Sequence, residues 1–485
     1  MTSAELSSLA FVVGLAIAAS LACVLAVATF LQLEQSIGKW VAALIVPSIA
    51  LAIALSSLLS GRDLKYAFAN IEAMSASSAE GSTQLLRAIT VVLIGLCGAS
   101  IIARLFRKGR QPPQSGQILL VAFLIFFICN EILNSIFGSY PAFAHNSLYV
   151  SVVFLAIYMN RNEPVEEFIR TAKVALLALM IASLAAAVLV PTVALEPNYK
   201  SWIPGVNFRL WGVGSNPNSI GPLALLLVLL ELEWRSTTLP WRTLTFGLAL
   251  AVLLLAQSKT ALGAGLVMVP ILLWYRIGRG NNGRIQTNLF PVLIGVLILA
   301  TLALVLGDFT KFWASVSTGQ MESDVSSLSG RVQIWSAAIN AWRENPLFGY
   351  GPLAWGSRHR ATIGMPFAFS AHNQFLQSLS VAGAMGLMSF VAYLSVLALF
   401  ACRCAGATHG ASLAILFVEL VRCVTEAPFS AGSLFNGDTL TQLVLFRIGL
   451  FGAVPSPKNW PASRSHADKP RETPETRFPQ GEIRE

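Results

Sequence analysis

Long apolar segments recur along this chain, and they constrain its fold more than any other feature of the sequence. From residue 6 to about residue 453, runs nearly free of Asp, Glu, Lys and Arg follow one another. Each run is long enough to cross a bilayer as a helix, and a helix satisfies its own backbone hydrogen bonds in lipid. The pattern therefore predicts a polytopic helical membrane protein.

The composition excludes a soluble globular protein. Of the 485 residues, 55% are apolar and 12% are charged, and the mean hydropathy is +0.66, whereas soluble domains carry about 25% charged residues. The formal net charge is +9, from 33 Lys and Arg against 24 Asp and Glu. In a membrane protein this excess is divided between the two membrane sides. It therefore gives no reason to expect a nucleic-acid partner.

The apolar runs predict an all-α bundle of about 11–13 transmembrane helices. The first run follows no basic segment and shows no clear cleavage site, so we interpret it as an uncleaved span. The expected spans lie near residues 6–33, 39–60, 85–105, 116–138, 142–159, 173–194, 219–233, 240–256, 260–276, 287–307, 373–401, 410–425 and 438–453.

The basic loops predict the orientation of these spans. Short loops rich in Arg and Lys face the cytoplasm, and such loops follow every second span, as around Arg107 and at Arg403. This alternation places the amino terminus outside and the carboxyl-terminal tail in the cytoplasm. It leaves these connections on the outer side: 61–84, 195–218, 257–259, 308–372 and 426–437.

Three regions follow from this pattern. We expect an N-terminal transmembrane bundle at 1–194, a core at 195–454, and a polar cytoplasmic tail without ordered structure at 455–485. The core contains the longest connection, the outer loop at 308–372. Connections of this length are uncommon unless they are functional, so the core is where we expect the site.

The long outer loop has a predicted internal order. Trp335, Ile339 and Trp342 follow one another at helical spacing, and Pro346 ends the pattern. An amphipathic helix with tryptophans suits the membrane interface. The glycines and prolines of 346–356 predict a tight turn after it.

Positively charged side chains lie on the outer side, where the orientation rule does not require them. For Lys311 and Arg343, passive translocation of a long loop is a sufficient reason. Arg209, Lys259 and Arg331 instead lie near membrane boundaries among small or turn-forming residues, where they could bind phosphate. Lys200, Arg358 and Arg360 are further outer cations, and we include Arg358 and Arg360, together with the polar Asn373, as candidate substrate-binding residues.

His372 is the candidate for proton chemistry. With Asn373 it stands where the long loop re-enters the membrane, and it opens the pattern H-N-x9-G-x-x-G, which ends at Gly383 and Gly386. The two glycines would let another helix approach closely. Imidazole exchanges a proton near neutral pH, so we predict a catalytic or substrate-positioning role for His372. The alternative is an inert interfacial side chain.

The other histidines receive no catalytic role. His145 stands at an outer boundary but lacks the glycine spacing, and His409 and His466 fall on the cytoplasmic side. The six cysteines show no paired spacing, so we expect neither disulfides nor a metal site.

Acidic and buried charged residues are interpreted as structural. Glu426 and Asp438 lie on the outer side near the end of the bundle, where each either assists as a base or, as we favour, serves as a cap or an ion-pair partner. Charged residues within spans are expected to pair inside the bundle, and these are Glu131, Glu419, Arg422 and Arg447.

Motifs of several other enzyme classes are absent from the sequence. There is no GxSxG of a serine hydrolase, no HExxH of a zinc protease and no GxxxxGK[ST] of a nucleotide-driven pump. We expect no cofactor and no metal, and the energy for any reaction would come from the substrate or from a gradient.

Several segments, taken in order, resemble the O-antigen ligase and polymerase family, which includes exopolysaccharide polymerases. The strongest are GRVQIW at 330–335, NPLFGYG at 345–351 and AHNQFLQSLSVAGAMGL at 371–387. RLWGVGSNPNSIG at 209–221 and QSKTALGA at 257–264 agree more loosely. The resemblance covers roughly residues 200–400.

The resemblance implies an inner-membrane glycosyltransferase of the C-type class, acting at the periplasmic face on a glycan linked to undecaprenyl diphosphate. Ligases of this kind pass the glycan to a lipid A core sugar, and polymerases pass it to another carrier-linked repeat. The family's loop arginine falls on Arg331, its motif histidine on His372 and an upstream arginine on Arg209. Lys259 stands where many relatives have arginine, so the charge is kept but the bidentate geometry is not.

This chemistry suits the residues found independently. The developing charge on a leaving diphosphate calls for fixed cations, which Arg209, Arg331 and Lys259 would supply without a metal. His372 would orient the acceptor hydroxyl or remove its proton, and in-line attack would invert the anomeric centre.

Three alternatives remain open at the level of sequence. Ligase and polymerase share the motifs, so the acceptor is either a lipid A core or a growing glycan. A secondary transporter or flippase of an anionic lipid-linked saccharide would use the same cations, although no inverted repeat is visible. A scaffold subunit of an export complex is the third reading.

Overall fold

The computed structural model describes residues 37–65, 80–106, 116–236, 238–278, 331–366 and 368–451. Within these ranges the chain is helical apart from one small antiparallel sheet, so the expected all-α membrane fold is confirmed. Six of the described helices are long and apolar enough to cross a membrane. The expected spans near 6–33 and 287–307 and the tail at 455–485 lie outside the described residues, and each of the other expected spans coincides with a helix or a run of helices.

The elements follow one another closely in the chain. The helices are α2 (Ile37–Leu58), α4 (Glu80–Phe106), α5 (Gln117–Phe127), the π-helix η1 (Ile128–Leu133), α6 (Asn134–Phe137), the 3-10 helix η2 (His145–Ser147), α7 (Leu148–Met159), α8 (Val165–Leu189), α9 (Pro191–Ala194), α10 (Pro217–Glu233), α11 (Leu239–Ala256), α12 (Lys259–Gly278), α14 (Arg331–Glu344), α15 (Ser357–Thr362), α16 (Gln374–Cys404), α17 (Ala411–Thr425) and α18 (Gly437–Phe451). The sheet pairs β1 (Leu195–Pro197) with β2 (Phe208–Leu210).

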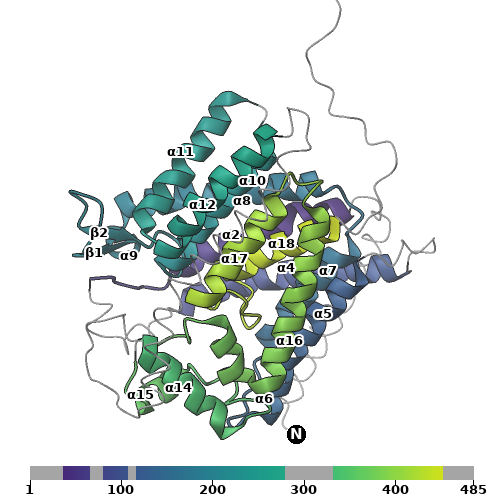
Figure 1. Cartoon of the computed structure of the whole chain (residues 1–485), viewed down its shortest axis with the longest axis vertical. Coiled ribbons are helices and arrows are strands. Elements are labelled where there is room, and N and C mark those ends of the chain that lie inside the picture. The colour runs from purple at the N-terminus through teal and green to yellow at the C-terminus, as the bar shows by residue number, and fades with distance from the viewer. Residues whose placement is uncertain are drawn as a thin grey trace, which may run out of the picture.

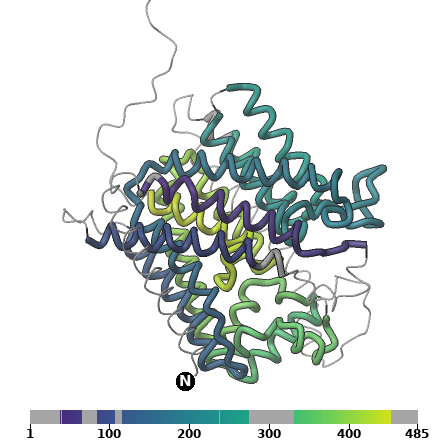
Figure 2. The backbone as a smooth tube through the Cα atoms, turned by 180° about the vertical axis from the view of Figure 1, so that it is seen from behind, coloured from purple at the N-terminus to yellow at the C-terminus, as the bar shows by residue number. Residues whose placement is uncertain are grey.

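Two helices form the centre of the bundle. Every residue of α10 from Pro217 to Leu232 except Asn218 is buried, and α18 is almost as completely enclosed. A helix that is apolar all round has to be covered on all sides. Here α10 packs against α8, α11, α12, α17 and α18. Figure 2 shows α18, in yellow, beside the purple α2, with which it is in contact.

Helices α14 and α15 form a separate group at one end of the molecule (Figure 1). Helix α14 ends at Glu344, as the position of Pro346 predicts, and it packs against α16. The short helix α15 was not expected from the sequence. It follows a turn that begins at Pro346 and contains Gly349 and Gly351, both with positive φ.

This turn docks into a break in α16. At Gly383 the helix adopts φ 64° and ψ −159°, which only glycine tolerates readily. The amides of Ala384 and Met385 donate to the carbonyls of Pro346 and Leu347, at 2.9 and 3.2 Å. A Cβ on Gly383 would lie 2.5 Å from the Leu347 carbonyl. The segment that approaches Gly383 is therefore a loop, where the sequence predicted a helix.

Gly386 serves a different contact. Its carbonyl accepts a hydrogen bond from Nδ2 of Asn130, at 3.1 Å, and Asn130 belongs to η1. At this second glycine a neighbouring helix does approach closely, as predicted. The glycines of the H-N-x9-G-x-x-G pattern thus connect α16 to the turn on one side and to η1 on the other.

Candidate functional site

The carboxylate of Glu426 is the centre of a polar cluster that joins four separate parts of the chain. Its Oε2 lies 2.9 Å from Nδ1 of His372, and its Oε1 accepts a hydrogen bond of 2.7 Å from Nδ2 of Asn218. Nη2 of Arg331 lies 3.8 Å from the same Oε1. The Glu426 side chain is 13% exposed, against 30% for His372 and 34% for Arg331. The carboxylate is therefore largely enclosed, while the histidine and the arginine face outward.

Glu426 is held by the end of α17. It is the first residue after that helix, and its amide donates to the carbonyl of Arg422. The preceding residue, Thr425, shares a hydrogen bond of 3.0 Å with Thr260, the second residue of α12. The position of the carboxylate is thus fixed relative to two helices.

His372 lies immediately before α16 in a left-handed backbone conformation, with φ 48°. Such a conformation is uncommon for a side chain other than glycine, and it occurs often at functional sites. Because Nδ1 faces Glu426, the second ring nitrogen, Nε2, is left without a hydrogen bond among the described residues. The ring is thus oriented by one nitrogen and free at the other.

Asn373 is a helix cap. Its Oδ1 accepts hydrogen bonds from the amides of Phe375 and Leu376, and its Nδ2 donates to the carbonyl of Val424. These bonds tie the start of α16 to the end of α17, which positions His372 beside Glu426. The contacts of Asn373 are therefore those of a positioning residue, although we expected it to bind substrate.

Arg209 reaches the cluster through Asn218. On β2, its Nη2 donates to Oδ1 of Asn218 at 3.0 Å, and its Nε donates to the carbonyl of Ala256 at 2.9 Å. Its guanidinium carbon also lies 5.1 Å from the centre of the Tyr199 ring. Most of its donor capacity is thus directed into the protein, and its charge is held one side chain away from Glu426.

Lys259 is exposed at the first position of α12. It is next to Thr260, which bonds to Thr425 beside Glu426. No hydrogen bond or ion pair engages its ammonium group among the described residues. Of the three cations predicted to bind phosphate, Lys259 is the one without a protein partner.

Arg358 and Arg360 lie apart from the cluster, on α15. Arg360 is 6% exposed, donates from Nη1 to the carbonyl of Pro366 and stacks over the ring of Phe369, 4.0 Å from its centre. Arg358 is exposed. Neither residue contacts Glu426 or His372, so the structure brings together only part of the predicted set.

A buried ionic network lies behind the cluster. Arg422 pairs with Glu419 at 3.0 Å and with Asp438 at 2.5 Å, and its Nη2 also donates to the carbonyl of Asn218 at 3.4 Å. Arg422 and Glu419 are nearly inaccessible to solvent. This confirms the expected pairing of Glu419 and Arg422 and the role of Asp438 as an ion-pair partner. Asn218 links this network to the cluster, because its backbone carbonyl bonds to Arg422 and its side chain bonds to Glu426.

The pairing expected for two other charged residues is not found among the described residues. Glu131, on η1, forms no ion pair with a described residue, and a Cβ on Gly432 would lie 3.2 Å from its carboxylate. Arg447 donates to the backbone carbonyl of Glu163, where a carboxylate was expected. Both remain inside the bundle, but hydrogen bonding and packing take the place of a salt bridge.

Three helices begin around the cluster: α10 just before Asn218, α12 at Lys259 and α16 just after His372. The amino-terminal end of a helix carries unpaired N–H groups and a partial positive charge, which favour anions. At α16, Asn373 caps two of these amides. The ends of α10 and α12 have no such side-chain hydrogen bond within the part of the chain that the structure describes. They add to the positive potential of the arginines and Lys259.

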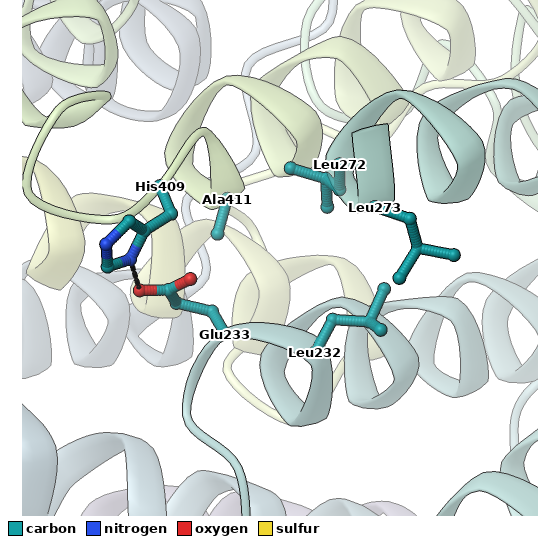
Figure 3. Close-up of a pocket in the computed structure, with 6 residues that line it drawn as sticks. All are labelled: Leu232, Glu233, Leu272, Leu273, His409 and Ala411. Carbon is teal, nitrogen blue, oxygen red and sulfur yellow. Dashed lines mark hydrogen bonds and ion pairs between the residues drawn. The ribbon is translucent and has the colours of Figure 1, made fainter. Parts of the chain in front are cut away.

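A pocket of the molecule lies elsewhere. Its lining residues are Leu232, Glu233, Leu272, Leu273, His409 and Ala411, and Figure 3 shows His409 directed at Glu233, with Nδ1 to Oε1 at 2.6 Å. Glu233 ends α10, and Asn218 lies in its first turn, so the pocket and the cluster are separated by the length of that helix, roughly 22 Å. The pocket is therefore not part of the cluster.

Metal-binding groups are not assembled here. Among the described residues, no three His, Cys, Asp or Glu side chains lie where they could hold a metal ion. The cluster pairs one carboxylate and one imidazole with cationic side chains, a set suited to anions and proton transfer.

Sequence reasoning missed two participants. Asn218 appears in the predictions only within the RLWGVGSNPNSIG motif. Glu426 was expected to be a cap or an ion-pair partner, not the centre of the polar cluster. The signal for Asn218 was its place in a Ser-Asn-Pro-Asn turn directly before an apolar run. Nothing local indicates that this asparagine meets a glutamate 208 residues further along the chain.

Comparison with known protein families finds a match to part of the chain. Residues 244–391 match a family model described as O-antigen ligase. The match supports the resemblance found in the sequence over this part of the chain, which includes Lys259, Arg331 and His372. Arg209, Asn218 and Glu426 lie outside the matched range. No curated protein matches the chain.

Proposed function

We propose that this protein transfers a glycan from an undecaprenyl diphosphate carrier to an acceptor hydroxyl at the periplasmic face of the inner membrane. The family match supports glycan transfer of the O-antigen ligase or polymerase type. The observation that carries the proposal is the His372–Glu426 pair, which leaves Nε2 of the imidazole free beside cationic groups.

His372 acts as the base in this proposal. If Nδ1 carries the proton that bonds to Glu426, Nε2 presents a lone pair to the acceptor hydroxyl. The carboxylate then fixes the tautomer and stabilises the imidazolium that forms, the role that an acidic residue has beside histidine in hydrolase triads. The short contact of 2.9 Å and the low exposure of Glu426, 13%, favour this assignment.

The cations receive the leaving group. Arg331 is held only loosely, at 3.8 Å from Glu426, and Lys259 has no partner among the described residues, so both can turn to a diphosphate. Arg209 contributes mainly its charge, since its Nε and Nη2 already bond to the protein. Fixed cations at a developing negative charge are among the strongest contributions that a site can make.

The reaction then balances without a cofactor. The acceptor oxygen attacks C1 of the sugar from the face opposite the diphosphate, and its proton passes to Nε2 of His372. The bond between C1 and the diphosphate oxygen breaks, and undecaprenyl diphosphate leaves with that electron pair. A single in-line displacement inverts the configuration at C1, and the charge that a metal would supply comes from side chains.

The acceptor is either a lipid A core sugar or the end of another carrier-linked glycan. All the clustered residues fall within 195–454, so we propose this region as the catalytic core and residues 1–194 as a supporting bundle surrounded by membrane lipids. The carrier's long lipid would lie in the bilayer beside that core.

Activity in a closed system tests the proposal. The purified protein in nanodiscs, which sustain no gradient, should lengthen or relocate glycan when given lipid-linked donor and acceptor, and His372→Ala and Arg331→Ala should lose that activity. Transfer at the parental rate by either variant would contradict the assigned roles. Movement of lipid-linked glycan across proteoliposomes without any new glycosidic bond would support a transporter instead.

A further inference from the structure

Arg62 is a buried cation without an acidic partner, close to the cluster. It follows α2, in the connection that the orientation rule places on the outer side, and it is 8% exposed. No carboxylate of the described residues pairs with its guanidinium. Burial lowers the pKa of Arg62 to about 10. Burying a charged arginine costs folding free energy unless its N–H groups form hydrogen bonds.

Most of the N–H donors of Arg62 bond to backbone carbonyls of one short segment, residues 212–215. Nη1 donates to the carbonyl of Gly214 at 2.7 Å, and Nη2 donates to the carbonyl of Gly212 at 2.7 Å. Nε donates to the carbonyl of Val193 at 2.8 Å. The planar guanidinium therefore acts as a fork that fixes residues 212–215 against the end of α8 and α9.

Other contacts hold the same segment in the same place. Oγ of Ser57 donates to the Gly214 carbonyl at 3.1 Å, and the amide of Val213 donates to Oγ of Ser183 at 3.2 Å. Gly212 has φ 57°, and a Cβ there would lie 2.5 Å from the Ser183 side chain. The segment has no room to shift without breaking several of these contacts.

The segment connects two members of the cluster. Arg209 lies three residues before Gly212, and Asn218 lies three residues after Ser215, in the first turn of α10. These two side chains bond to each other at 3.0 Å, and Asn218 bonds to Glu426 at 2.7 Å. A displacement of 212–215 would therefore move both residues relative to the carboxylate.

We propose that Arg62 is a positioning residue for the donor site, which holds Arg209 and Asn218 in register with Glu426 through the backbone carbonyls of 212–215. This inference rests on the proposed function. Arg62 touches no reacting group in this arrangement, and it acts through the segment it binds.

Arg62→Lys is the first test, because lysine keeps the charge but cannot form the fork. We expect kcat/KM for the lipid-linked donor to fall about 10- to 100-fold, the scale that a misplacement of about 1 Å produces. Hydrogen exchange at the amides of 212–215 should become faster. Ser57→Ala, which removes one hydrogen bond to the same segment, gives a second variant if Arg62→Lys does not fold, with an expected loss of about 3-fold.

Arg104→Lys is the matched control. Arg104 is also enclosed in the bundle, where it bonds to Asn160 at 3.1 Å and pairs with Glu163 at 2.5 Å, away from the cluster. At equal loss of thermal stability, it should keep its donor kcat/KM within about 2-fold. An equal loss of activity in both variants would reduce Arg62 to a general structural residue and overturn the proposal.

A double-mutant cycle with Asn218→Ala separates positioning from stability. If Arg62 acts through Asn218, adding Arg62→Lys to Asn218→Ala should lower kcat/KM by less than about 3-fold further. The same fold-loss in both backgrounds would contradict the proposal. Equal hydrogen exchange at 212–215 in wild type and Arg62→Lys would contradict it as well.

Binding of undecaprenyl diphosphate alone, without glycan, distinguishes a failure of the proposed function from a failure of the role proposed for Arg62. If the wild-type protein binds this lipid but transfers nothing, the proposed function is wrong, and weaker binding by Arg62→Lys still supports the role of Arg62. Equal binding by the two proteins would overturn that role. If the wild type does not bind the lipid, both the donor assignment and the role of Arg62 fall.

Discussion

Nδ1 of His372 lies 2.9 Å from Oε2 of Glu426, although 54 residues and the whole of α16 and α17 separate them in the chain. The contact depends on Asn373, which follows the histidine and caps α16. It also depends on the extended backbone of Glu426 itself, the first residue after α17. One nitrogen of the ring is therefore bonded to the protein, and the other has no partner among the described residues.

Glu426→Gln should lower kcat for glycan transfer by about 100- to 10,000-fold, because the amide keeps the shape but cannot stabilise an imidazolium. The measurement is the rate at saturating donor in nanodiscs. Glu233→Gln is the matched control, since it changes a carboxylate that bonds to His409 at 2.6 Å, at the other end of α10. A Glu426→Gln enzyme with the parental rate would remove the orienting role.

Lys259→Gln should raise the KM for the lipid-linked donor about 10-fold, because it removes one charge-assisted contact to the diphosphate. The kcat should change less than KM if the contact forms equally in the ground and transition states. Lys200→Gln, a change at another exposed outer lysine, serves as the control. Equal effects of the two substitutions would mean that only the overall charge of the outer face matters.

Gly383→Ala should destabilise the protein by about 2–4 kcal/mol, because it combines positive φ with a steric clash against backbone. The added Cβ would lie 2.5 Å from the carbonyl of Leu347, which cannot turn aside as a flexible side chain can. Denaturation in detergent measures the change. Gly98→Ala on α4, where a Cβ meets nothing within 4 Å, should leave stability unchanged or increase it.

Arg422→Met should cost about 3–5 kcal/mol, since it leaves two buried carboxylates without a counter-charge. The triple variant that adds Glu419→Gln and Asp438→Asn should recover part of this loss, because no charge is then left unpaired. The comparison is made by denaturation, with Arg403→Met, at an exposed arginine, as the control. A triple variant less stable than Arg422→Met would show that the amides themselves are not accommodated.

The turn before α15 should lose stability in mild acid. Burial lowers the pKa of His359, whose ring lies 4.1 Å from that of Tyr350, and the charge of Glu344 opposes this shift. The folded state therefore binds a proton less readily than the unfolded chain. Stability is complete above the ordinary histidine pKa of about 6.5 and falls as the pH drops below it towards the lowered value.

Limited proteolysis within 346–362, compared at pH 7.5 and pH 5.5 and corrected for the protease's own pH dependence, measures this effect. Cleavage of the wild type should increase at the lower pH, and His359→Gln should show a smaller change. Equal pH dependence of the two proteins would mean that His359 is not the group responsible.

The sequence predicted the elements of this fold because the signals for them are local. The apolar runs of α2, α4 and α16 mark their own positions, and Pro346 marks the end of α14. The break at Gly383 was not predicted, because an isolated glycine in an apolar helix equally suits close helix packing. Its cause lies in a loop that the pattern of α16 does not contain.

Residues of the cluster could be predicted where their charge and their position in the chain were enough to single them out. They were missed where only contacts with distant residues show their role. Arg331 and His372 stood out as polar residues of the long outer loop, with Arg331 inside it and His372 at its end. Arg62 looks like any arginine after a span, and only its contacts with carbonyls 131 to 153 residues away show its role. Arg360 was expected to bind substrate, but its guanidinium donates to the Pro366 carbonyl and stacks over the Phe369 ring.

The docking of the 346–351 turn into α16 joins the supports of Arg331 and His372. Hydrogen bonds connect the turn to Ser380 and Val381 before the break and to Ala384 and Met385 after it. Helix α14, which carries Arg331, leads directly into this turn, and His372 stands at the head of α16. The two side chains are thus carried by one hydrogen-bonded unit. If the helices of the bundle move relative to one another, the distances from these side chains to Glu426 and Lys259 should change more than the distance between them.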